Sequence, residues 1–161
     1  MSALSLGLWF AVSTLSAGDT CKPALAQVDV VQSSGTQAIE LTPLFAHAER
    51  ISSAAKDGSK HDYDAIRLVD VLTQAKLPLG KALRGKPVGW SVLAEAKDDY
   101  KASFALAEID PDIGDRAVWI AACRDGKALP DDEGPLRLLV PDDKRPARAV
   151  RQLLRLRIVT P

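Results

Sequence analysis

The first half of the chain alternates short apolar runs with polar turns, which predicts paired strands followed by a short helix. Residues 28–31 and 38–41 read as strands, and the turn residues 33–35 between them predict a β-hairpin. Thr42 is expected to cap a short helix, with Pro43 in its first turn, where the missing N–H costs nothing.

The next segment changes from strand-like to helix-like spacing. Two apolar runs, 51–55 and 63–66, flank the polar stretch 56–60, which predicts a loop or a hairpin turn. Apolar residues then recur at i, i+3, i+4 and i+7 over 68–75, so this segment is expected to be a helix with one buried face.

The second half reads mostly as strands. Residues 88–96 alternate, 97–99 form a turn, and 100–106 return in an antiparallel direction, while 107–114 read as a turn-rich link. The nearly continuous apolar run at 118–123 predicts a strand that is buried on both faces.

Three further signals complete the pattern. Asp125-Gly126 marks a turn, and residues 136–140 read as a strand. Residues 153–159 read as a last strand, in which Leu154, Leu156 and Ile158 alternate with a basic face of Arg155 and Arg157. Many short strands with a few short helices predict an α+β, mainly β domain with a mixed or antiparallel sheet.

Composition narrows the class of protein. The 161 residues suffice for one domain, and 47% hydrophobic and 26% charged residues are typical of a globular protein. Only 5% of the residues are aromatic and the net charge is zero, which argues against a nucleic-acid binder or a general membrane-surface binder.

The beginning of the chain resembles a secretory signal. Residues 4–15 are apolar, too short to span a bilayer, and Ala24-Leu25-Ala26 supplies a small-x-small cleavage pattern. We therefore expect a signal peptide at 1–26, a mature domain at 27–161 in the periplasm or outside the cell, and no membrane insertion after cleavage. The start lacks Lys and Arg, so a buried N-terminal helix is the alternative.

The site of cleavage decides the state of the two cysteines. Cleavage after Ala26 removes Cys21 and leaves Cys123 as a lone thiol, whereas cleavage nearer Ser16 or Ala17 keeps both, and an oxidising compartment could then join them. Cys123 lies in an apolar run and is interpreted as a buried small hydrophobe. Two cysteines without a CxxC pattern give no metal-site spacing.

Positive charge gathers near the end of the chain. Between Arg137 and Pro161 there are seven Lys or Arg residues and two acids, which predicts an anion site. Arg145, Arg148 and Arg151 are three residues apart and are expected on one face of a helical turn or a nearby loop. Arg155 and Arg157 are instead interpreted as a solvated face of an edge strand that resists aggregation.

The order of motifs resembles a known family. Arg124-Asp125-Gly126-Lys127-Ala128-Leu129 is followed by Gly134-Pro135-Leu136-Arg137-Leu138, Val140-Pro141 and then the arginine segment. This order is similar to that of the oxidoreductase molybdopterin-binding domain, the fold of the sulfite oxidase superfamily. The resemblance implies that fold over most of 27–161 and a pterin-type cofactor held by the arginine segment.

The chain also departs from this pattern. Residues 27–88 lack the cysteine with which the family ligates molybdenum, Asp98-Asp99-Tyr100 lacks the family's glycine, and Ala149 stands where the family often has Trp. We therefore expect no metal and a pterin or molybdopterin-like ligand. Its candidate binding residues are Arg137, Arg145, Arg148, Arg151, Tyr100 and Asp98, although Asp98 could equally be a plain turn residue.

These observations favour a non-catalytic, exported pterin-binding domain. Small periplasmic relatives of this fold bind reduced pterins, so the resemblance implies a ligand sensor for a membrane-bound signalling partner. Two alternatives stay open: a molybdopterin-dependent oxidoreductase or a subunit of one, and an interaction domain without a ligand.

Overall fold

Two five-stranded sheets carry the fold in a computed structural model that describes residues 21, 27–55 and 57–161. The first sheet is mixed, in the order β2-β1-β10-β5-β6, because β1 and β10 run parallel and the other neighbours antiparallel. Its strands are β1 (Gln27–Gln32), β2 (Gly35–Glu40), β5 (Ser91–Ala96), β6 (Lys101–Ala105) and β10 (Leu153–Val159).

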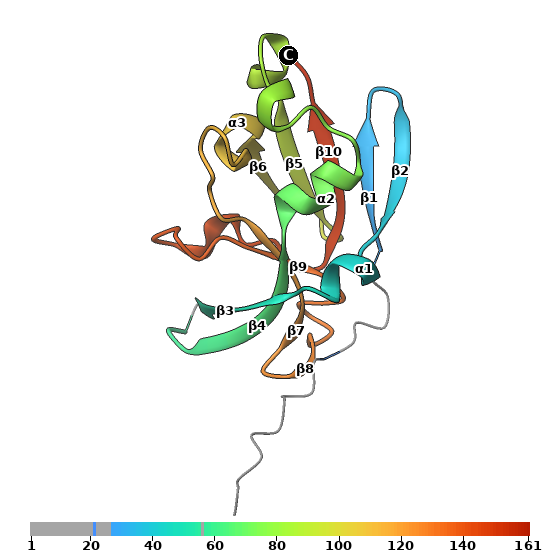
Figure 1. Cartoon of the computed structure of the whole chain (residues 1–161). Coiled ribbons are helices and arrows are strands. Elements are labelled where there is room, and N and C mark those ends of the chain that lie inside the picture. Colours follow the sequence, from blue (N-terminus) through green and yellow to red (C-terminus); the bar gives the residue numbers. More distant parts are fainter. Residues whose placement is uncertain (1–20, 22–26, 56) are drawn as a thin grey trace, which may run out of the picture.

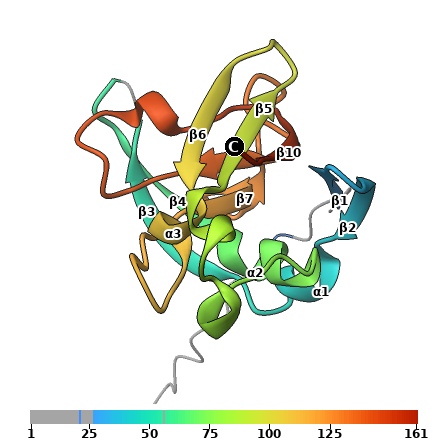
Figure 2. The same cartoon turned by 90° about the horizontal axis from the view of Figure 1, so that it is seen from above.

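The second sheet is antiparallel, in the order β3-β4-β7-β8, and β9 also pairs with β7. Its strands are β3 (Glu49–Ala54), β4 (Lys60–Arg67), β7 (Trp119–Arg124), β8 (Lys127–Ala128) and β9 (Arg137–Leu139). Figures 1 and 2 show the two sheets as separate layers of the mainly β, α+β domain, in agreement with the predicted fold class.

Short helices connect the strands. The α-helices are α1 (Thr42–Phe45), α2 (Leu68–Gln74) and α3 (Leu106–Ile109), and the 3₁₀ turns are η1 (Gly80–Ala82), η2 (Lys86–Gly89) and η3 (Pro146–Arg148). Helix α2 buries Leu68, Val71 and Leu72, the face that the apolar spacing predicts.

The main core lies between the sheets and is completed by α2. It joins Val28 and Val30 of β1, Leu156 of β10, and Ile120 of β7, each of them nearly inaccessible to solvent. A smaller apolar cluster covers the other face of the second sheet, around Tyr63, Ala65, Trp119 and Leu139. The predicted burial of β7 on both faces is thereby confirmed.

The predicted β1–β2 and β5–β6 pairs are confirmed as antiparallel. Of the two alternatives for the polar stretch 56–60, the hairpin is the one observed, because β3 and β4 pair antiparallel. Each arises from local alternation bounded by turn residues. The Asp125-Gly126 turn is also confirmed, with φ of 52° and 76°, the left-handed conformation that tight hairpin turns require.

Several local predictions are wrong for physical reasons. Thr42 is the first residue of α1 rather than its cap, and the N-cap position belongs to Leu41. Residues 88 and 89, predicted as the start of a strand, belong to η2, because Gly85 turns the chain with φ of 66° and Pro87 follows in the first turn. Residues 107–109 of the expected link belong to α3.

Strand β10 is the central strand of its sheet, so the prediction that Arg155 and Arg157 lie on an edge strand is wrong. A parallel pairing with β1, more than a hundred residues earlier, covers the edge that would otherwise be open. Within the described ranges no helix is both long and apolar enough to cross a membrane.

Candidate functional site

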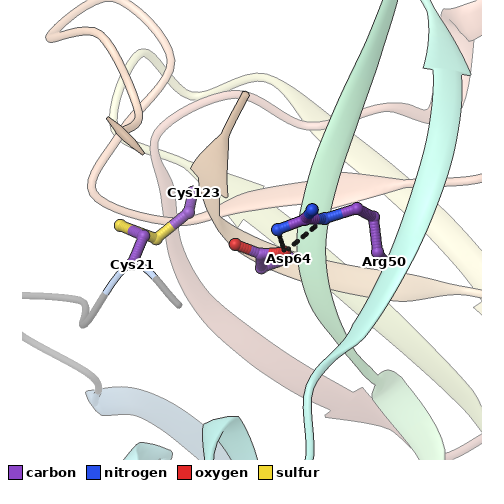
Figure 3. The surroundings of a disulfide bond; sticks show 4 residues. All are labelled: Cys21, Arg50, Asp64 and Cys123. Atoms are coloured by element: carbon purple, nitrogen blue, oxygen red, sulfur yellow. Dashed lines mark hydrogen bonds and ion pairs between the residues drawn. A yellow bond between two sulfur atoms is a disulfide. The ribbon is translucent and has the colours of Figure 1, made fainter. Parts of the chain in front are cut away.

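A disulfide joins Cys21 to Cys123, with their Cα atoms 6.1 Å apart (Figure 3). Cys123 is 1% exposed, as its apolar surroundings predict, but it is not a lone thiol. Of the two processing alternatives, the one that retains Cys21 is compatible with this bond. The bond itself is consistent with an oxidising, extracellular compartment. Apart from Cys21, the predicted signal segment 1–26 lies outside the described residues.

The disulfide bears on the cofactor that the resemblance implies. Molybdenum in that family needs a cysteine thiolate, and this chain has only two cysteines, whose sulfur atoms are bonded to each other. The residues therefore do not fit a molybdenum centre with a thiolate ligand.

Figure 3 also shows Asp64 lying between the disulfide and Arg50. The Nε and Nη2 atoms of Arg50 each donate to Asp64 Oδ1 over 3.1 Å, which pairs this buried carboxylate. Asp64 Oδ2 is buried and has no hydrogen-bond partner among the described residues. Sequence reasoning did not single out this pair, because the two residues are brought together only by the β3–β4 register.

Arg137, the first candidate ligand residue, is a core residue with a 5% exposed side chain. Its Nη1 donates to Glu133 Oε2 over 2.6 Å and to the Tyr63 hydroxyl over 3.1 Å. Arg124 binds the other oxygen of Glu133 at 2.8 Å. Burial raises the pKa of Tyr63, so its hydroxyl stays protonated beside these charges. This cluster fastens β9 to β4 and β7.

Arg148 is held by acids from two other segments. Its Nε and Nη2 donate to the two oxygens of Asp143 over 2.8 and 2.7 Å, and its Nη1 donates to Glu108 over 3.0 Å. The guanidinium lies 4.9 Å from the centroid of the buried Phe104 ring, and Arg116 contacts the same two acids. The hydrogen bonds that Arg148 donates to Asp143 raise the pKa of Arg148 and lower that of Asp143.

The other two arginines of the triplet do not share the ion pairs of Arg148. Arg145 and Arg151 are both exposed, and Arg151 faces Asp132 at 3.7 Å. Of the two predicted arrangements, a shared face of a helical turn is not observed, because only Arg148 lies within η3, whereas Arg145 precedes this turn and Arg151 follows it in the chain. The chain then extends, since the N–H and carbonyl of Val150 both pair with Leu138 of β9.

Tyr100 and Asp98 shape the β5–β6 turn. The Tyr100 N–H donates to Asp98 Oδ1 over 3.1 Å, which is the hydrogen bond of an Asx turn. Of the two interpretations of Asp98, a ligand-binding residue or a plain turn residue, this geometry favours the turn residue. The Tyr100 hydroxyl donates to the carbonyl of Ala147 and so joins this turn to η3. Tyr100 remains 47% exposed.

Arg155 and Arg157 share one carboxylate, that of the buried Glu95 on the neighbouring strand β5. Arg157 Nε donates to Glu95 Oε1 over 3.0 Å, and Arg155 Nε donates to Oε2. The hydrogen bonds from Arg157, which have the largest effect, and from Arg155 lower the pKa of the Glu95 carboxyl to about 2. Glu95 therefore balances one of the two positive charges of the basic face predicted for this strand.

A pocket of about 580 Å³ opens where the chain passes from the second sheet to the first. The Gly134-Pro135-Leu136 motif forms one wall, and none of the six candidate residues lines it. Its other apolar lining residues are Ala122, Ala128, Leu129, Leu153 and Leu154. Segments far apart in sequence build this pocket, because Leu153 N donates to Leu136 O over 2.8 Å and ties β10 to the motif.

Polar groups also line the pocket: Gln27, Asp29, Lys97, Asp131 and Gln152. Among the described residues, none of the three charged ones has an ion-pair partner within 4 Å, whereas Arg137, Arg148, Arg151, Arg155 and Arg157 all have one. Arg145 is also exposed and has no ion-pair partner among the described residues, but it lies outside the pocket. The three charged residues of the pocket are therefore free to meet a small molecule. Their positions in three separate segments gave the sequence no local signal.

A Ser-His-Asp arrangement lies elsewhere, where the β3–β4 and β7–β8 turns meet. His61 Nδ1 is 2.7 Å from Asp125 Oδ2, and its Nε2 is 3.1 Å from Ser59 Oγ. The Ser59 hydroxyl, however, donates to Asp57 over 2.6 Å, so its proton does not point to the imidazole. This arrangement tethers two turns and lacks the activated nucleophile of a hydrolase.

No known protein family matches the chain, and no curated protein is found to be similar to it.

Proposed function

We propose that this protein is an exported, non-catalytic domain that binds a small polar heterocycle of the pterin class in the pocket at Gly134-Pro135-Leu136. The pocket carries the proposal, because about 580 Å³ lies within the range of small-molecule sites and exceeds what one or a few waters need. The ligand class comes from the resemblance in motif order. A pterin is a flat bicycle with several donors and acceptors.

The pocket suits such a molecule in its chemistry. Leu129, Leu136 and Leu153 offer apolar surface to a flat ring. Asp29 and Lys97 offer an acceptor and a donor to the ring edges. A few placed polar groups in a mostly apolar cleft are the usual means of orienting a ligand. The arginine segment, in this proposal, supports the pocket through its ion pairs and does not touch the ligand.

The cysteine pair supports binding over oxidoreductase chemistry. A disulfide leaves no thiolate for the metal ligand that the family uses. The same bond supports an exported location, since such bonds persist in oxidising compartments. Signalling to a membrane-bound partner belongs to the proposal as the process that would make reversible pterin binding useful.

Calorimetry with reduced and oxidised pterins tests the proposal, together with mass spectrometry and metal analysis of the protein purified from the periplasm. We expect binding without stoichiometric molybdenum. Lys97→Ala and Asp29→Asn should each weaken binding roughly tenfold or more, the usual cost of a lost hydrogen bond to a charged group. Lys81→Ala, an exposed lysine outside the pocket, is the matched control.

The outcomes separate the three functions. Stoichiometric molybdenum would support the oxidoreductase. Absence of any pterin binding would favour the interaction domain. If Arg148→Ala with Arg151→Ala weakens binding while the pocket variants do not, the ligand is held by the arginine segment instead.

A further inference from the structure

Leu154 is an apolar residue whose side chain faces away from the core. Its alternation with Leu156 and Ile158 predicts a core position, yet Leu154 is 49% exposed while Leu153 is 4% exposed. A register shift between Leu153 and Arg155, a β-bulge against β5, turns the side chain outward. Leu154 then lines the pocket. Bulges of this kind commonly re-aim a side chain next to a binding site.

The residue that leads into this bulge is also irregular. Gln152 has a φ of 46°, a left-handed conformation that residues other than Gly, Asn and Asp rarely adopt. Three hydrogen bonds hold it: its N–H to Glu133 O over 2.7 Å, its Nε2 to Asp131 O over 2.7 Å, and Lys97 N–H to its carbonyl over 3.1 Å. Asp131, Lys97 and Gln152 all line the pocket.

Two backbone irregularities in three residues thus present a leucine to the pocket. A residue in the left-handed conformation is ordinarily Gly, Asn or Asp. Here the position is occupied by Gln152. Backbone conformations of this kind persist where the surrounding contacts over-determine them, and they concentrate at binding sites.

We infer that Leu154 selects the ligand, by packing against an apolar substituent that projects from the ring system. This inference rests on the proposed function and deepens it. In this arrangement the polar residues Asp29 and Lys97, which line the pocket, bind the edges of the ring. Leu154 and Leu129, in the same lining, contact an alkyl substituent on the ring, which an unsubstituted pterin lacks. The preferred ligand is therefore an alkyl-substituted pterin.

The experiment compares pterin with 6,7-dimethylpterin by calorimetry in the wild type and in Leu154→Ser. Each methyl group that packs on Leu154 should tighten binding about fourfold in the wild type, which corresponds to about 0.8 kcal/mol per buried methylene. In Leu154→Ser this preference should disappear, while the affinity for bare pterin changes little. Leu154 is half exposed, so the variant should fold, and circular dichroism and thermal unfolding verify this.

Val159→Ser is the matched control, because Val159 lies on the same strand, is 40% exposed and does not line the pocket. It should keep the preference for the methylated compound. If the wild type binds both compounds equally, or if Leu154→Ser keeps the full preference, the role of Leu154 is refuted and pterin binding stands. If neither compound binds, the proposed function fails and the inference fails with it.

Discussion

Breaking the disulfide should remove a large share of the stability of this domain. Cys21→Ser takes the sulfur from the partly exposed end of the bond, and Cys123→Ala takes it from the buried end. Serine is unsuitable at 123, because a buried hydroxyl without a partner would add its own cost of about 1–3 kcal/mol.

The size of the effect follows from the loop that the bond closes. The two cysteines are 102 residues apart, and a crosslink over about 100 residues lowers the entropy of the unfolded chain by an amount worth about 4.7 kcal/mol at 25 °C. In a domain of this size each kcal/mol of lost unfolding free energy lowers the midpoint temperature of thermal unfolding, Tm, by about 2–4 °C. We therefore expect Tm to fall by roughly 10–20 °C in either variant.

Thermal unfolding followed by circular dichroism measures this change in four samples: the wild type, the two single variants and the double variant. A double-mutant cycle isolates the shared bond. Because each single substitution already abolishes the crosslink, the double variant should be no less stable than Cys123→Ala. A reductant should bring the wild type down to the level of Cys21→Ser and leave that variant unchanged.

Two results would refute this reasoning. Additive losses in the double variant would mean that each side chain stabilises the domain by packing and not through the bond. A wild type indifferent to reductant, with both thiols shown to be reduced, would mean that the long loop contributes little to the unfolded-state entropy.

Two further predictions concern the buried charges. The pKa of Glu95 is held at about 2, below its ordinary value of 4.5, so its contribution to the free energy of unfolding is complete above about pH 4.5 and is lost as the pH falls toward 2. In urea unfolding, the stabilities of the wild type and Glu95→Gln should differ most at neutral pH and converge in acid. Parallel curves of stability against pH would contradict this prediction. Glu133 forms ion pairs with both Arg137 and Arg124, so Glu133→Gln should lower the free energy of unfolding by roughly 3–5 kcal/mol. Arg137→Met should lower it clearly less, because Arg124 still pairs with Glu133 in that variant. Equal losses in chemical unfolding would show that the two arginines do not share the carboxylate.

Local patterns were sufficient to predict much of the fold. The hairpins and α2 follow from alternation, turn residues and i, i+3, i+4 spacing, all of which lie within about fifteen residues of each other. The parallel pairing of β1 with β10 could not be predicted in this way, since no short-range signal specifies which distant strand fills a sheet. The outward turn of Leu154 was missed for the same reason, because the bulge forms only against β5.

The charge excess near the end of the chain shows where counting charges along a sequence is insufficient. Seven cations against two acids suggested an anion site, but most of the arginines pair with acids, and several of these acids come from other segments: Glu95 from β5, Glu108 from α3 and Glu133 from the link before β9. Arg155 and Arg157 join two strands of the first sheet through Glu95, Arg137 is held within the second sheet, and Arg148 joins η3 to α3. Charges without an ion-pair partner among the described residues also line the pocket at Gly134-Pro135-Leu136, so this motif remains the best place to look for a ligand, with Asp29, Lys97 and Leu154 as the residues to test.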